Sequence, residues 1–85
     1  MSARRPPLEY RDVVRGLSVL GFEKRPQKAT VHEQWIKTAK DRRYKVTVDK
    51  SKAPFGQFLV RSMAKQAGLS LGDFYKACGK GQAGS

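Results

Sequence analysis

Cysteine and histidine are scarce in this chain of 85 residues, which contains one of each, Cys78 and His32. One cysteine cannot form an internal disulfide or a cysteine-rich metal site. We therefore expect neither a metal nor another cofactor. Acidic residues are also few, with 7 Asp and Glu against 18 Lys and Arg, which gives a formal net charge of +11. Such an excess implies a polyanion or an acidic protein as a partner.

Long apolar runs are missing as well. No stretch approaches the roughly 20 apolar residues that cross a bilayer, and residues 1–7 are basic and lack the apolar core of a secretion signal. We therefore expect no membrane association and a cytoplasmic location. The length predicts one small domain over residues 8–78, with a flexible basic lead at 1–7 and a disordered Gly-rich tail at 79–85.

The first half of the chain predicts one helix and three strands. Apolar residues recur at three- and four-residue intervals from residue 8 to residue 20, which indicates a helix that ends at Gly21. Residues 22–27 predict a short edge strand, since Pro26 cannot donate a ladder hydrogen bond. Strands are expected at residues 31–38 and 44–48, and the short polar turn between them requires an antiparallel hairpin.

The second half predicts helices. Residues 49–56 have the composition of a loop, and residues 57–67 place apolar side chains on one helical face before the stop at Gly68. Ser70 and Asp73 have capping-box spacing for a short helix through Cys78. The fold class is therefore α+β: a helix, a three-stranded antiparallel sheet, a helix and a short C-terminal helix. Double-stranded-RNA-binding domains have this arrangement.

The aromatic residues are interpreted as core. Tyr44, Phe58, Phe74 and Tyr75 fit the apolar faces of the expected elements. Trp35 is also expected in the core, although its ring would suit stacking on a base.

His32 lies within the most basic segment, residues 24–52, which has ten basic and three acidic residues. Imidazole can both accept and donate a proton near neutral pH, and the surrounding cations would attract a polyanion to it. This combination favours RNA cleavage, because a base at the 2′-hydroxyl needs no metal. The alternative is a surface histidine without a catalytic role. Glu33 should point to the opposite strand face and is interpreted as a surface acid.

Several separated segments, in this order and spacing, resemble the HicA toxins of bacterial toxin–antitoxin pairs. They are Leu-Gly-Phe at 20–22, Thr-Val-His-Glu-Gln-Trp at 30–35, Lys-Val-Thr-Val at 45–48, and Gln-Ala-Gly-Leu-Ser at 66–70 with Phe74 after it. The similarity spans about residues 8–78. It implies a small messenger-RNA-cleaving protein with a double-stranded-RNA-binding-domain-like fold, a catalytic His32, and a HicB-type antitoxin that covers the active surface.

Candidate RNA contacts lie on both sides of His32. The residues expected to contact RNA are Lys28, Thr30, Lys37, Arg42 and Arg43. In the family the segment before the histidine usually contains glycine and serine, whereas this chain has Ala29 and Val31. The lost serine hydroxyl could have contacted a phosphate, so a non-catalytic RNA-binding module of the same fold stays open as the alternative function. A DNA-binding accessory protein is less favoured, because no base-reading recognition helix is evident.

Overall fold

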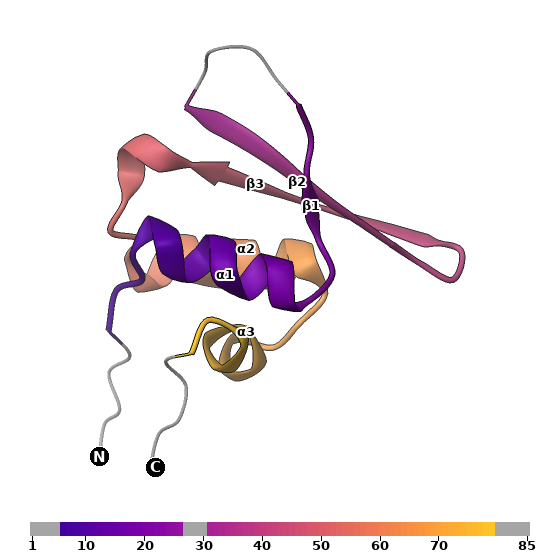
Figure 1. Ribbon diagram of the computed structural model, residues 1–85. Helices are drawn as coiled ribbons and strands as arrows, with labels where there is room; N and C mark the ends of the chain where they lie inside the picture. The colour runs from indigo at the N-terminus through magenta and orange to yellow at the C-terminus, as the bar shows by residue number, and fades with distance from the viewer. Residues whose placement is uncertain (1–5, 27–30, 80–85) are drawn as a thin grey trace.

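The computed structural model describes residues 6–26 and 31–79, and the expected order of elements is confirmed there (Figure 1). Helix α1 covers Tyr10–Val19, and strands β1, β2 and β3 cover Glu23–Lys24, His32–Ala39 and Arg42–Asp49. A single 3-10 turn, η1 at Lys50–Lys52, precedes helices α2 at Gln57–Ala67 and α3 at Leu71–Ala77. The fold is α+β, as expected. Of the lead expected at 1–7 and the tail expected at 79–85, residues 1–5 and 80–85 lie outside the described residues.

The three strands form an antiparallel sheet in the order β1-β2-β3, so β2 is central. The β2–β3 ladder runs from His32 opposite Asp49 to Ala39 opposite Arg42. The hairpin turn is therefore shorter than expected, and Lys40 takes a positive φ of 58° in it. Strand β1 is an edge strand of two residues and pairs with β2 alone.

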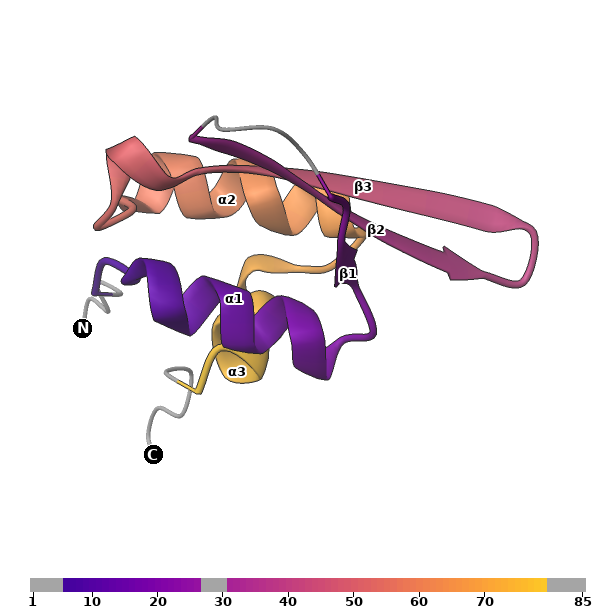
Figure 2. The ribbon, with the colours of Figure 1, turned by 45° about the horizontal axis from the view of Figure 1, so that its top comes forward.

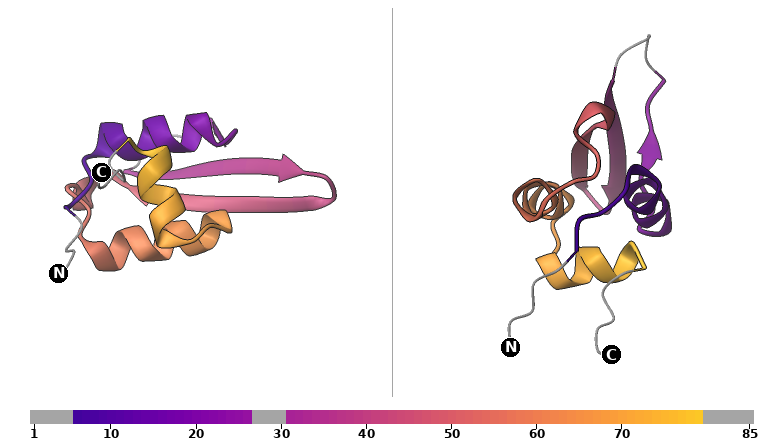
Figure 3. Two further views of the ribbon diagram at one scale, coloured as in Figure 1. Left: turned by 90° about the horizontal axis from the view of Figure 1, so that it is seen from below. Right: turned by 90° about the vertical axis from the view of Figure 1, so that its left-hand side faces the viewer.

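All three helices lie on one side of the sheet (Figures 1 and 2). Helices α1 and α2 run beneath the strands, and α3 crosses below both of them, while the tip of the β2–β3 hairpin extends past the helices (Figure 3). The core fills this helix-covered side with residues from every layer, among them Leu17, Val46, Val60 and Phe74, all fully buried. We call the other side of the sheet the open face.

The ends of the helices follow the expected signals. Gly21 and Gly68 have φ of 97° and 78°, the left-handed region that glycine enters without a steric cost, and Gly68 ends α2. The hydroxyl of Ser70 accepts a hydrogen bond of 3.1 Å from the backbone N–H of Asp73 and so caps α3. Within the described ranges, no helix is both long enough and apolar enough to cross a membrane.

The aromatic core is confirmed except at one position. Trp35, Phe74 and Tyr75 are buried, and Tyr44 packs against the core while partly exposed. Phe58 was expected to be buried as well, but its exposed fraction is 83%. The buried face of α2 begins at Val60 and continues at three- and four-residue steps, which turns the Phe58 side chain toward solvent.

Candidate active site and nucleic-acid interface

His32 is the first residue of β2 and lies directly across the ladder from Asp49, the last residue of β3. Nε2 of His32 is 3.2 Å from Oδ2 of Asp49. The imidazole is 57% exposed, whereas the Asp49 side chain is only 20% exposed. A carboxylate in this position orients the imidazole and selects its tautomer. The sequence analysis did not identify Asp49 as part of the site.

The Asp49 carboxylate is fixed by its own turn. Its Oδ1 accepts hydrogen bonds of 2.6 Å from the hydroxyl and 3.0 Å from the backbone N–H of Ser51. The hydroxyl bond is the main cause that lowers the pKa of Asp49 below its ordinary value of 3.8, and the nearby charges of His32 and Lys52 lower it further. Asp49 is therefore an anion throughout the neutral pH range, with its second oxygen directed at the imidazole.

Glu33 points to the opposite face of β2 from His32, as the alternation of a strand requires. The interpretation of Glu33 as a surface acid is wrong, because its exposed fraction is 4%. Its carboxylate accepts hydrogen bonds of 2.6 Å from the Tyr10 hydroxyl and 3.1 Å from the Trp35 indole, and Lys24 Nζ lies 3.8 Å away. Burial, assisted by the hydrogen bond to Glu33, raises the pKa of Tyr10 to about 12. This network anchors β2 to α1 beneath His32.

The open face of the sheet is basic. Strand alternation places Gln34 and Ile36 on the same face as His32, opposite Thr47 and Lys45. A shallow hollow of about 490 Å³ lies there, lined by Arg25, Gln34, Ile36, Arg43 and Lys45. Among the described residues, the hollow is lined by three cationic side chains and no acidic one, although Glu23 at the β1 edge is opposite Ile36. A polyanion crossing this face toward His32 would meet a favourable potential.

Two of these cations were not predicted as RNA contacts. Arg25 donates its backbone N–H to the Gln34 carbonyl at 2.9 Å, so it extends the pairing of β1 along β2. Lys45 is on the open face because it pairs with Ile36. The two-residue alternation along residues 44–48 could have placed Lys45 on the open face from the sequence. Arg25 lies on this face only because β1 pairs with β2, which the sequence alone does not show.

The expected RNA contacts divide between the two faces. Arg43 lies on the open face and lines the hollow. Arg42 is at the end of the hairpin, with its guanidinium carbon 5.5 Å from the centre of the Tyr44 ring. Lys37 pairs with Tyr44 on the helix-covered side, and its Nζ lies 5.8 Å from the centre of the Phe22 ring. The structure thus does not bring Lys37 together with His32. Lys28 and Thr30, like Ala29 between them, lie outside the described residues.

Comparisons with known proteins agree with this fold. A family model described as the HicA toxin of bacterial toxin–antitoxin matches residues 10–69, which is more than half of the chain and includes the whole β2–β3 hairpin with His32 and Asp49. No curated protein and no solved structure matched the chain. The chain belongs to the HicA family of toxins from bacterial toxin–antitoxin pairs.

Proposed function

We propose that this toxin is a metal-independent endoribonuclease that cleaves messenger RNA with His32 as its catalytic residue. The observation that carries the proposal is the pair of His32 and Asp49, 3.2 Å apart, on the same face of the sheet as the basic hollow. The imidazole is exposed enough to reach a phosphodiester. Its carboxylate partner supports it as a similar carboxylate does in other histidine-dependent enzymes.

The reaction needs only groups that the chain and the RNA supply. A base takes the proton of the 2′-hydroxyl, and the oxygen forms a new bond to the adjacent phosphorus. The bond from phosphorus to the 5′-oxygen breaks, an acid protonates that oxygen, and a 2′,3′-cyclic phosphate remains. His32 can perform either proton transfer, and Asp49 would hold the imidazole in place for it. DNA lacks the 2′-hydroxyl and would not be cut.

The basic open face would hold the RNA on either side of the cleaved bond. Arg25, Arg43 and Lys45 provide phosphate contacts that position the strand without reading its sequence. Lys28 remains the predicted cation for the charge that develops on phosphorus, because it is close to His32 in sequence. One histidine contributes a rate factor of roughly a hundred to ten thousand, so we expect a slow enzyme.

The partner would be a HicB-type antitoxin that covers the same face. A surface with a net positive charge is best matched by an acidic partner surface. Such a partner would associate quickly and would also keep RNA from binding to the same face. We accordingly expect the chain to act in the cytoplasm, where it meets messenger RNA, and to be toxic when it is produced without its antitoxin. An adjoining gene for an acidic protein would support this pairing.

The test compares the native protein with His32→Ala and Asp49→Asn on a mixed RNA in excess chelator. We expect the native protein to leave 2′,3′-cyclic phosphate ends and His32→Ala to cut nothing while it retains its RNA affinity. Asp49→Asn should lower kcat by about a hundredfold or more with little change in KM, because the loss of such a carboxylate beside a catalytic histidine leaves the ring in the wrong tautomer. Circular dichroism checks that both variants keep the native fold.

The alternative is an RNA-binding module without catalysis. Val31, where the family usually has serine, is 43% exposed and offers no hydroxyl to a phosphate beside His32. If the native protein and His32→Ala bind RNA equally and neither cuts it, the nuclease is excluded and this alternative takes its place.

A further inference from the structure

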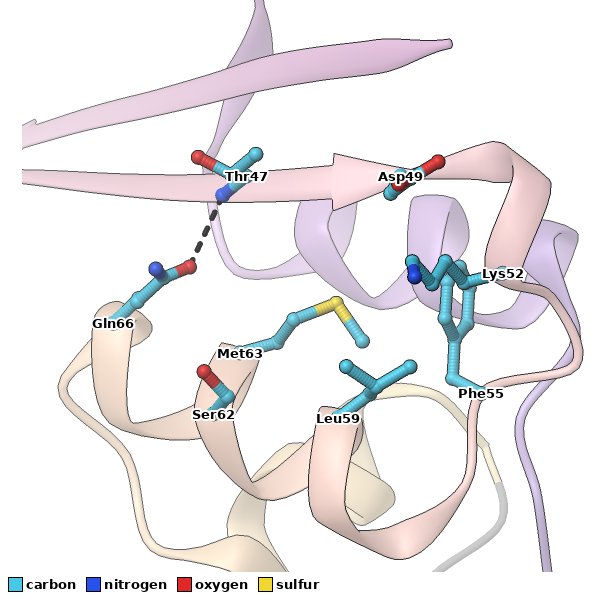
Figure 4. A pocket seen from close by; sticks show the side chains of 8 residues that line it. All are labelled: Thr47, Asp49, Lys52, Phe55, Leu59, Ser62, Met63 and Gln66. Atoms are coloured by element: carbon cyan, nitrogen blue, oxygen red, sulfur yellow. Dashed lines mark hydrogen bonds between the residues drawn. The ribbon is translucent and has the colours of Figure 1, made fainter.

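A second concave site lies on the other side of β3 from β2. It is a cleft of about 100 Å³ between the outer edge of β3 and helix α2 (Figure 4). The lining residues are Thr47, Asp49, Lys52, Phe55, Leu59, Ser62, Met63 and Gln66. None of the candidate RNA contacts within the described ranges lines this cleft, but it shares Asp49 with the active site.

The cleft has an apolar floor and a polar rim. Phe55 and Met63 form the floor and are 1% and 4% exposed, with Leu59 partly buried beside them. In Figure 4 the thioether of Met63 and the side chain of Leu59 point into the cleft from α2. A methionine sulfur packs favourably against an aromatic ring. Because the rim carries Lys52, Ser62 and Gln66, the cleft suits a flat ring with polar edges.

The β3 edge presents main-chain groups to the same cleft. The Thr47 N–H points away from β2 and donates to Oε1 of Gln66 at 3.1 Å, whereas the Lys50 N–H points toward β2 and bonds to the Val31 carbonyl. Successive residues of an antiparallel edge strand alternate in this way, so the main-chain groups of Asp49 face the cleft together with those of Thr47. The amide oxygen of Gln66 thus occupies the position that a ring carbonyl of a base would take.

We propose that this cleft binds one unpaired base of the RNA, next to the phosphodiester at His32, and so selects where the strand is cut. The inference rests on the proposed nuclease function. A base that carries a ring carbonyl, as uracil, cytosine and guanine do, would replace the Gln66 amide as the acceptor of the Thr47 N–H. Adenine has no such carbonyl. Because Asp49 forms part of the cleft and holds His32, a base bound there fixes the neighbouring phosphate relative to the imidazole.

The first experiment needs no cleavage. Uridine 3′-monophosphate and adenosine 3′-monophosphate are titrated into the native protein, and NMR follows the Met63 methyl and the Thr47 amide. We expect uridine 3′-monophosphate to shift both signals and adenosine 3′-monophosphate to bind about tenfold more weakly, since adenine leaves the Thr47 N–H without a base acceptor and an unmade hydrogen bond costs about that much. If neither nucleotide shifts either signal, the proposal is overturned. The occupant of the cleft would then be an apolar side chain of a partner protein.

Two variants change the cleft in opposite directions. Ser62→Phe places a ring over the cleft and should weaken uridine 3′-monophosphate binding by about tenfold or more. Gln66→Ala removes the competing acceptor and should strengthen binding by about threefold. Ser18→Phe on α1 is the matched control, because Ser18 is exposed and does not line the cleft. Equal affinity for Ser62→Phe and Ser18→Phe would contradict the proposal.

Cleavage mapping separates this proposal from the nuclease proposal. We expect the native protein to cut beside carbonyl-bearing bases and Ser62→Phe to lose that preference by about tenfold, with slower residual cleavage that still requires His32. If the protein cuts no RNA but the Met63 methyl responds to the nucleotide, the nuclease fails and the base site stands. If the native protein and Ser62→Phe both cut RNA with the same base preference, the base site fails and the nuclease stands.

Discussion

The hydroxyl of Ser51 lies 2.6 Å from Oδ1 of Asp49 and leaves Oδ2 of that carboxylate directed at His32. The bond joins the η1 turn to the active site. It is also the largest cause of the lowered pKa of Asp49, ahead of the backbone N–H of Ser51 and the charges of His32 and Lys52. The ionised state of the histidine's partner thus depends more on its own turn than on the histidine.

Ser51→Ala should raise the pKa of Asp49 toward its ordinary value of 3.8. Because the folded-state pKa is lowered, the stabilisation from ionised Asp49 is present above pH 3.8 and is lost as the pH falls through the folded value. In Ser51→Ala this loss should be smaller and should be complete at a higher pH, because the folded-state pKa then lies closer to 3.8. Carboxyl-carbon NMR of Asp49 measures the midpoint, and His32→Ala is the comparison variant. A larger shift in His32→Ala than in Ser51→Ala would contradict the order of causes.

The basic hollow on the open face predicts a specific salt dependence. Arg25→Ala, Arg43→Ala and Lys45→Ala should each reduce the slope of log affinity against log salt by about 1 if each side chain meets one phosphate. Lys76→Ala is the control, since Lys76 is exposed on α3, which lies on the far side of the helices from the sheet (Figure 1). Fluorescence anisotropy with a labelled single-stranded RNA gives the slopes. An equal loss of slope in Lys76→Ala would indicate charge attraction without a defined RNA path.

Much of the fold could be predicted because each element carries its own periodicity and stop signal. The helix expected at residues 57–67 has those bounds in the structure, since the apolar spacing and Gly68 both act locally. The wrong prediction for Phe58 arose because composition alone does not say which side of a helix a residue occupies. An aromatic residue two positions before the buried face is indistinguishable from core by composition, and its angle around the helix axis decides its exposure.

The active site was only half predictable. His32 stood out by chemistry, but Asp49 depends on the hairpin register, which the turn sets. A turn at residues 39–43 would pair His32 with Lys50, whereas the shorter turn of the structure pairs it with Asp49. A slip of one residue changes every facing pair. Glu33 was misjudged for a similar reason, because its partner Tyr10 is 23 residues away in the chain.

The partly buried hydrogen bond from Tyr10 to Glu33 predicts loss of stability in alkali. Burial, the hydrogen bond and the negative charge of Glu33 raise the pKa of Tyr10 from 10.0 to about 12 in the folded protein. A raised folded-state pKa contributes stability that is complete below pH 10.0 and is lost as the pH rises toward about 12. Urea unfolding across this range should show a fall in the free energy of unfolding that is smaller in Tyr10→Phe. Parallel curves for the two proteins would contradict the assignment.

Helices α1 and α3 meet at Gly16 and Cys78 so closely that a side chain at Gly16 has no room. A Cβ built on Gly16 would lie 2.5 Å from Sγ of Cys78 and 3.1 Å from its Cα and backbone nitrogen. Gly16→Ala should therefore lower the free energy of unfolding by about 1–3 kcal/mol, the usual cost of overpacking. Part of this cost is offset by the better helix propensity of alanine, about 1 kcal/mol.

Gly56→Ala is the matched control for this contact, because a Cβ at Gly56 meets nothing within 4 Å and its φ is an ordinary −73°. Gly56 is the N-cap of α2, where alanine is less favourable than glycine, so that variant should unfold within about 1 kcal/mol of the native protein. The Cys78 thiol gives a second measurement. Burial raises its pKa to about 12, so it should resist alkylation in the native protein and react faster in Gly16→Ala as α3 separates from α1. Equal stability and equal alkylation rates in the two glycine variants would show that α3 can move aside without cost.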